Sequence, residues 1–190
     1  MAAMMSSTIP VITPTNSLVN PMLTDMYQIS MSYAYWKSGR HNDHAVFDLF
    51  FRKTPFKGEF CVFAGLDEVQ KHLSSFKFTE SDIAYLKTVL PHCDEGFFDY
   101  LLTLDCSQMR VYSMQSGTVV FPKVPLLRIE GPLCVGQLLE TTLLNLINFP
   151  SLIATNAARM RSAAGDDKKL LEFGLRRAQG ARIVELFIVC

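Results

Sequence analysis

The sequence lacks an excess of charge of either sign. Its 190 residues include 18 lysines and arginines and 18 aspartates and glutamates, so the formal net charge at pH 7 is zero. A neutral chain has no general electrostatic attraction to nucleic acid or to an anionic membrane surface. We therefore expect neither as a partner, and any bound anion must be held by a local group of basic side chains.

Long hydrophobic runs and paired cysteines are also missing. No apolar stretch reaches about 18 residues without a polar break, so no membrane span is predicted. Residues 1–22 contain no lysine or arginine, which argues against a signal or transit peptide and favours a flexible lead-in. The five cysteines form no C-x-x-C pair. Neither a zinc site nor a disulfide framework is predicted, and the reduced cytosol is the expected location.

The sequence does have enough apolar residues for a core. Hydrophobic residues make up 49% of the chain and charged residues 19%. This composition is typical of a globular protein, and the length suits one domain of ordinary size.

The first half alternates between helical and strand patterns. A helix is predicted from about residue 25 to 37, with Thr24 as its N-cap and Asp25 in its first turn. Residues 44–53 and 59–65 are aromatic and β-branched, which predicts a hairpin or two nearby strands. Three amphipathic segments then predict short helices: LDEVQKHLSSF, TESDIAYLKTVL and DEGFFDYLLTL.

The second half changes its pattern twice. Residues 109–131 alternate and contain a turn and two prolines, which predicts two or three short antiparallel strands. A long apolar helix is predicted to begin at Pro132, to break or bend at Pro150 and to end near Gly165. LLEFG, residues 170–174, is predicted as a buried strand. The order of elements indicates an α/β fold.

Two clusters are candidates for binding chemistry. Arg176 and Arg177 follow Gly174 and could hold a carboxylate or phosphate with their guanidinium groups, although both could equally pair with surface carboxylates. Tyr27 could stack on a flat ring and offer its hydroxyl, or it could be a core tyrosine. Asp25 could line the same site or simply complement the helix dipole.

Other polar residues have less specific interpretations. His41 and His44 lie in a polar connector, where solvated side chains are more common than metal ligands, so no metal site is predicted there. Glu140 lies in the middle of an apolar helix and needs a partner if it is buried. Either a structural or a site-supporting role would be consistent with its position.

Four stretches together resemble the nicotinate phosphoribosyltransferase family in its animal-type form: LTDMYQISMSYAYWKSG, FDLFFRKTPFKGEFCVFAGLDEV, GPLCVGQLLETTLLNLINFPSLIATNAARMR and LEFGLRRAQG. The resemblance extends from about Leu23 to Gly180. It implies an enzyme that forms a C–N bond between nicotinate and 5-phosphoribosyl-1-pyrophosphate, giving nicotinate mononucleotide for NAD biosynthesis. It also implies ATP hydrolysis coupled to this step, a requirement for Mg²⁺ and a homodimer in the cytosol.

The resemblance also implies residue roles. Tyr27 matches the family's tyrosine that lies against the nicotinate ring and, in related enzymes, reaches the site of the neighbouring subunit. Asp25 belongs to the same motif, and Arg176 matches an arginine beside the base and phosphoribosyl groups. Arg177 belongs to the same run and is expected to bind substrate with it.

The family fold is an irregular α/β barrel with a β-rich second domain. By resemblance, residues 23–131 form the N-terminal α+β portion, residues 132–180 begin the barrel, and residues 181–190 are a divergent tail. The barrel would therefore be incomplete. The family's phosphorylated histidine and its glycine-rich phosphate loop find no match, so no catalytic residue is expected within this chain.

Two alternatives follow from these expectations. The chain could be a non-catalytic truncated isoform or fragment that lacks the later active-site motifs. The related enzyme that uses nicotinamide has a similar first motif, but GLRRAQG fits the nicotinate branch better.

Overall fold

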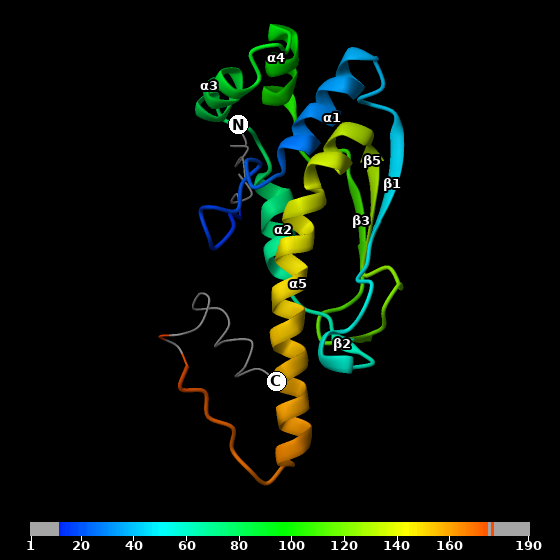
Figure 1. Ribbon diagram of the computed structural model, residues 1–190, viewed down its shortest axis with the longest axis vertical. Helices are drawn as coiled ribbons and strands as arrows, with labels where there is room; N and C mark the ends of the chain where they lie inside the picture. The colour runs from blue at the N-terminus through cyan, green and yellow to red at the C-terminus, as the bar shows by residue number, and fades with distance from the viewer. Residues whose placement is uncertain (1–11, 175, 177–190) are drawn as a thin grey trace, which may run out of the picture.

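The computed structural model describes residues 12–174 and Arg176 (Figure 1). The elements, in chain order, are α1 (Met26–Lys37), β1 (His44–Leu49), the 3-10 turn η1 (Pro55–Lys57), β2 (Cys61–Val62), α2 (Leu66–Ser75), α3 (Glu80–Val89), α4 (Glu95–Thr103), β3 (Arg110–Ser113), β4 (Val119–Val120), β5 (Leu127–Pro132) and α5 (Leu133–Ala164). The fold is mixed helix and sheet, as expected. These described residues form no closed barrel.

The main sheet has three antiparallel strands in the order β1-β5-β3. Leu127 and Ile129 of β5 point into the core, where their alternation with polar neighbours places them. The long helix α5 packs against β1 and β5, and it also contacts α1, α2 and β2 (Figure 1). This helix therefore joins the main sheet to β2 and to the helices α1 and α2.

Residues 44–53 and 59–65 each contain a strand, as predicted, but the alternative that they form a hairpin is wrong. β1 pairs with β5, while β2 pairs with β4 in a separate two-stranded sheet. The connection between β1 and β2 contains Pro55 and two left-handed residues, Phe56 (φ 56°) and Lys57 (φ 58°). This turn breaks the extended conformation, and the two strands enter different sheets. The antiparallel strands predicted in residues 109–131 are confirmed.

Helix α1 begins at Met26, one residue later than predicted. Asp25, not Thr24, is the N-cap. The side-chain oxygen of Gln28 accepts hydrogen bonds from the Asp25 N–H at 3.0 Å and from the Thr24 hydroxyl at 2.7 Å. Gln28 thus completes the capping arrangement from the third helical position, which selects Asp25 over its neighbour.

Helix α5 runs without a break through Pro150, so of the two predicted alternatives, a break or a bend, the break is wrong. At 1.5 Å per residue its 32 residues extend about 48 Å. Pro150 cannot donate to the carbonyl of Leu146, one turn earlier, and Gly65 lies against that carbonyl oxygen. The hydroxyls of Ser151 and Thr155 then bind the backbone N–H groups of the β2 region.

The predicted buried strand at residues 170–174 is also wrong. Leu171 and Phe173 are 75% and 83% exposed, and the segment has no regular structure. A strand buried on both faces needs neighbouring strands and covering helices. Within residues 12–174 no strand lies beside it. Arg177 and the tail at residues 181–190 lie outside the residues that the structure describes.

Candidate functional site

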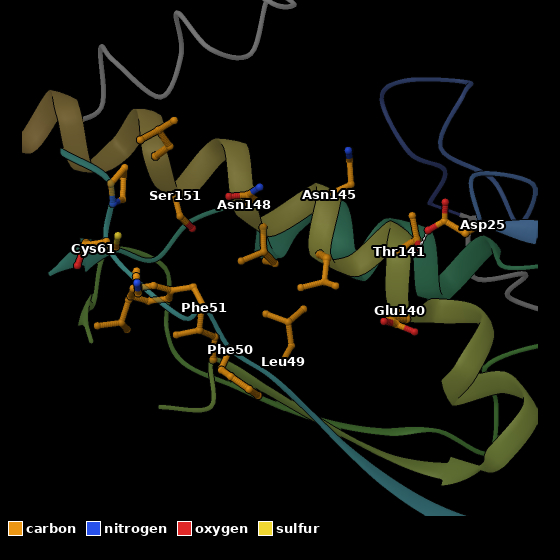
Figure 2. A pocket seen from close by; sticks show the side chains of 18 of the residues that line it. Asp25, Leu49, Phe50, Phe51, Cys61, Glu140, Thr141, Asn145, Asn148 and Ser151 are labelled. Carbon is orange, nitrogen blue, oxygen red and sulfur yellow. Dashed lines mark hydrogen bonds between the residues drawn. The ribbon is translucent and has the colours of Figure 1, made fainter. Parts of the chain in front are cut away.

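A large open groove lies between α5, the end of β1 and the start of α1. Its volume is about 810 Å³. We call it the main groove. Figure 2 shows Leu49, Phe50 and Phe51 across from the residues of α5 that line it. The groove is positioned by the pairing of β1 with β5, because this pairing holds the β1 end beside α5.

One wall of the main groove is apolar and the other carries a row of polar side chains. Thr141, Asn145 and Asn148 recur at helical spacing along α5 and line the groove together. Asn145 and Asn148 are exposed. Carboxamides offer both donors and acceptors, so this row can bind a polar ligand while the Phe50 and Phe51 wall covers an apolar ring.

The α1 end of the main groove is acidic. The Thr141 hydroxyl donates to Asp25 Oδ2 at 2.6 Å, as the dashed line in Figure 2 marks. Gln137 Nε2 donates to Glu140 Oε2 at 3.0 Å. Tyr27 lines this end of the groove together with Glu140 and Thr141. Partial burial and the neighbouring carboxylate of Glu140 raise the pKa of Tyr27, so its phenol keeps the proton at neutral pH.

The other end of the main groove is basic. Lys53 lines it beside Thr54, and Arg52 lines the adjoining hollow. Neither cation has a carboxylate within 4.0 Å among the residues that the structure describes. An unpaired cation beside an open groove can bind an incoming carboxylate or phosphate.

Backbone strain gathers beside this basic end. Phe56, Lys57 and Lys123 are non-glycine residues with positive φ, and the Lys123 N–H donates to the Phe51 carbonyl at 2.8 Å. Left-handed non-glycine residues cost of order 1–3 kcal/mol each and are common at functional sites. The hydrogen bond holds the two strained loops together next to the apolar wall.

The structure brings two of the four predicted binding residues together. Asp25 and Tyr27 both line the main groove. Arg176 is exposed and does not line it, and Arg177 lies outside the described residues. The substrate-binding role of each of these four residues stays a prediction.

Sequence reasoning missed Lys53 and left Glu140 undecided. Glu140 proves to be exposed in the main groove with Gln137 as its partner. A signal for this face was present, because polar residues at positions 141, 145 and 148 interrupt an otherwise apolar helix. No comparable signal marks Lys53, which shares a basic run with Arg52.

His41 and His44, in the connector after α1, belong to no group of described side chains that could hold a metal ion. His41 packs its ring against Tyr100, with ring centroids 4.7 Å apart, and its carbonyl accepts a hydrogen bond from the Cys134 N–H. In the part of the chain that the structure describes, no three histidine, cysteine or acidic side chains are placed to hold a metal ion. None of the helices described there is long and apolar enough to cross a bilayer.

Comparisons with known proteins agree on one family. The model of the nicotinate phosphoribosyltransferase (NAPRTase) N-terminal domain matches residues 22–148. Nicotinate phosphoribosyltransferase 2 of Arabidopsis thaliana is 60% identical over 167 residues, 88% of this chain and 30% of that protein. The Homo sapiens protein is 51% identical over 161 residues, 84% of this chain and again 30% of the relative. The chain thus spans about 30% of the length of these curated relatives.

Solved structures show the same relationship. Human nicotinic acid phosphoribosyltransferase superposes with a TM-score of 0.77 at 50% identity, covering 83% of this chain and 32% of the human chain. Nicotinate-nucleotide pyrophosphorylase from Pyrococcus furiosus has a TM-score of 0.61 at 22% identity, covering 96% of this chain and 38% of that one, which is a likeness of fold alone.

Proposed function

The chain belongs to the nicotinate phosphoribosyltransferase family through its N-terminal domain, and we propose that it supplies one wall of a site that joins nicotinate to 5-phosphoribosyl-1-pyrophosphate in NAD biosynthesis. The observation that carries the proposal is the convergence of Asp25, Tyr27 and the unpaired Lys53 on one groove. A flat acid and a sugar diphosphate need both an aromatic or apolar surface and a cation, and this groove has both.

The chemistry requires positioning more than covalent help from the protein. The ring nitrogen of nicotinate attacks C1 of the ribose, and the bond from C1 to the pyrophosphate oxygen breaks with its electron pair on the leaving group. The transition state has oxocarbenium character, as in glycoside cleavage. Tyr27 would orient the ring, and Lys53 would stabilise a negative group of the substrates.

The family's chemistry calls for Mg²⁺ and for ATP as a co-substrate. Mg²⁺ is commonly held by one or two carboxylates together with substrate phosphates. Asp25 and Glu140 are the carboxylates that line the main groove, so they are the ligands this chain could offer. When bound, the ion would neutralise charge on the departing pyrophosphate.

We also propose that the functional protein is a cytosolic homodimer whose α1 helices contribute to the interface. Met26, Tyr27 and Met31 of α1 are large apolar or aromatic residues with exposed side chains. Exposed groups of this kind mark an interaction surface when they cluster on one helix. Size-exclusion chromatography with light scattering would detect the dimer, and Met31→Glu should weaken it.

Activity measurements test the main proposal. The 190-residue chain, and any longer product of its gene, would be incubated with nicotinate, the pyrophosphate donor, Mg²⁺ and ATP. We expect nicotinate mononucleotide from the longer protein, with nicotinamide a poor competitor, and no turnover by the 190 residues alone. Tyr27→Ala and Lys53→Ala should lower kcat/KM by about tenfold or more, because each removes a substrate contact. Unchanged kinetics in both variants would refute the assignment of this groove.

A second candidate function is that of a non-catalytic partner of full-length subunits. Its support is the same exposed α1 surface. Co-expression with a tagged full-length subunit tests it. A mixed dimer with reduced activity per full-length subunit would support this function, and failure to co-purify would reject it.

A further inference from the structure

Three polar side chains in the second half of α5 share one spacing. Ser151, Thr155 and Arg159 are each four residues apart, so they lie on one face of the helix. This half of α5 lies beside β2 (Figure 1). Ser151 and Thr155 are buried and Arg159 is half-buried. Polar groups in such positions need hydrogen-bond partners.

All three side chains bind backbone groups of the segment that contains β2. The Ser151 hydroxyl accepts from the Ala64 N–H at 3.1 Å, the Thr155 hydroxyl accepts from the Val62 N–H at 2.8 Å, and Arg159 Nη2 donates to the Phe60 carbonyl at 3.2 Å. The bound residues are two apart in the chain. Four helical residues rise about 6 Å and two extended residues about 6.6 Å, so the spacings match. These three side chains, which we call the α5 ladder, hold the edge of β2 opposite β4.

Arg159 has the most specific contacts of the α5 ladder. Its guanidinium carbon lies 5.2 Å from the centroid of the Phe60 ring, which allows a cation–π interaction. The guanidinium also fills the space beside Gly58, because the three atoms nearest to a Cβ added there all belong to Arg159. No carboxylate lies within 4.0 Å of Arg159 among residues 12–174. Its partners are therefore one carbonyl, one ring and the bare backbone of a glycine.

These contacts fix one end of the loop that carries Lys53. The other end is fixed where the Lys123 N–H donates to the Phe51 carbonyl. Within residues 52–59 the described structure has one hydrogen bond, a local one from the Gly58 N–H to the Pro55 carbonyl at 3.0 Å. The position of the Lys53 backbone therefore depends on the two anchors outside this stretch.

We propose that Arg159 is a positioning residue that holds the Lys53 loop at the basic end of the main groove. Its bearing on substrate binding rests on the proposed function, because that function gives Lys53 its negative partner. Arg159 touches no reacting atom and acts through Gly58 and Phe60. A loop that is already in place loses less entropy when an anion binds to it, so the anchor increases affinity.

The first test measures hydrogen exchange in the 190-residue chain. Arg159→Ala removes the anchor, and we expect the amides of residues 54–60 to exchange about fivefold faster, the effect of losing one hydrogen bond. The amides of β1 should keep their rate. Unchanged exchange in residues 54–60 would overturn the proposal. An equal rise in β1 would also overturn it, because Arg159 would then only stabilise the whole fold.

Arg161→Ala is the matched control. Arg161 lies two residues further along α5, and its Nη1 donates to the carbonyls of Gly165 and Lys168, beyond the end of the helix. This substitution also removes a guanidinium that binds backbone carbonyls. It should leave the exchange of residues 54–60 unaltered. A rise equal to that in Arg159→Ala would count against a specific anchor.

A double-mutant cycle with Gly58 tests the contact itself. Gly58 has φ −68° and ψ 158°, which alanine adopts without strain. Gly58→Ala should therefore act only by displacing the guanidinium, and it should speed exchange in residues 54–60 as Arg159→Ala does. In the Arg159→Ala background the added methyl group has space, so it should have no further effect. Equal effects of Gly58→Ala in both backgrounds would overturn the proposal.

Kinetics in any longer product of the gene link the anchor to the site. Arg159→Ala should raise KM for 5-phosphoribosyl-1-pyrophosphate about fivefold with little change in kcat, because Lys53 is misplaced and not removed. In the Lys53→Ala background the same substitution should add nothing. Additive losses would show that Arg159 acts independently of Lys53. If no such product formed nicotinate mononucleotide, the proposed function would fail, while the exchange measurements would still decide the anchor.

Discussion

Thr141 and Asp25 are joined by a hydrogen bond of 2.6 Å although they are 116 positions apart in the chain. The threonine hydroxyl on α5 donates to the carboxylate that caps α1. Together with the bond from Gln28 Nε2 to the Gln137 carbonyl, this interaction fixes the start of α1 against the central helix at the acidic end of the main groove. The site and the helix-to-helix contact share these two residues.

Removing this hydroxyl should weaken the fold measurably. Thr141→Val keeps the branched shape and loses the donor, and we expect the free energy of unfolding to fall by about 1 kcal/mol. Thr141→Ser keeps the donor and should lose much less. Urea denaturation of the two variants checks this, and a Thr141→Val protein as stable as the wild type would show that the bond contributes nothing.

His72 should make stability depend on pH. It is 1% exposed, packs edge-on against Phe76, and neither ring nitrogen has a hydrogen-bond partner in the described part of the chain. Burial lowers the pKa of His72 to about 4 from the ordinary 6.5. Between these values the unfolded chain binds a proton that the folded chain rejects, so stability rises with pH.

As the pH falls from 6.5 toward 4, the free energy of unfolding should drop by about 1.4 kcal/mol per pH unit, whereas above pH 6.5 this group adds no pH dependence. His72→Leu removes the group, so the difference in unfolding free energy between variant and wild type should change with pH by this amount. Urea denaturation at pH 5 and at pH 7.5 measures it. His92→Gln, on the surface, serves as the control and should leave the slope intact.

The local elements were predictable because their signals are local. The short helix predicted from TESDIAYLKTVL forms as α3, and Thr79 and Asp82 make a capping box at its start. The predicted N-cap of α1, Thr24, is one residue away from the observed one, because Thr24 and Asp25 are both good capping residues. Only the side chain of Gln28, which reaches back to both, decides between them.

The pairing of strands and the full groove were not predictable in the same way. Nothing in residues 44–49 specifies that their partner is β5, more than seventy positions later, because alternation reports burial and not the identity of the neighbour. The motif around Tyr27 pointed to one end of the main groove. Lys53 and Glu140 belong to that groove only because β5 brings the β1 end beside α5.

Loss of the side-chain hydroxyl should change the stability of the fold in opposite directions at Tyr100 and at Tyr33. The Tyr100 hydroxyl is buried beside the weakly bonding Cys134 thiol and has no hydrogen-bond partner of ordinary geometry in the described residues. The Tyr33 hydroxyl donates to Asp94 Oδ2 at 3.1 Å. An unsatisfied buried hydroxyl destabilises a fold, whereas a satisfied one stabilises it.

We therefore expect Tyr100→Phe to raise the free energy of unfolding by about 1 kcal/mol and Tyr33→Phe to lower it by a similar amount. Thermal and urea denaturation of the pair check the signs. A destabilised Tyr100→Phe protein would indicate that the hydroxyl is satisfied, for example by an internal water molecule.

Gly65 should be among the least replaceable residues of the scaffold. It caps α2 with φ 103°, and a Cβ there would collide with the carbonyl oxygen of Leu146. That carbonyl is the one which Pro150 cannot bind within α5, so the close approach of the two elements is built around a proline and a glycine. Substitution must therefore overcome both an unfavourable backbone conformation and a contact with rigid backbone.

Gly117→Ala separates these two costs. Gly117 also has a positive φ, 88°, but no atom lies within 4 Å of its added Cβ. We expect Gly117→Ala to cost about 1–2 kcal/mol, the conformational penalty alone. Gly65→Ala should cost several kcal/mol and displace the β2 region from α5, because the Leu146 carbonyl cannot move without distorting the helix. Urea denaturation gives the two free energies, and equal losses would mean that the collision is relieved at no cost.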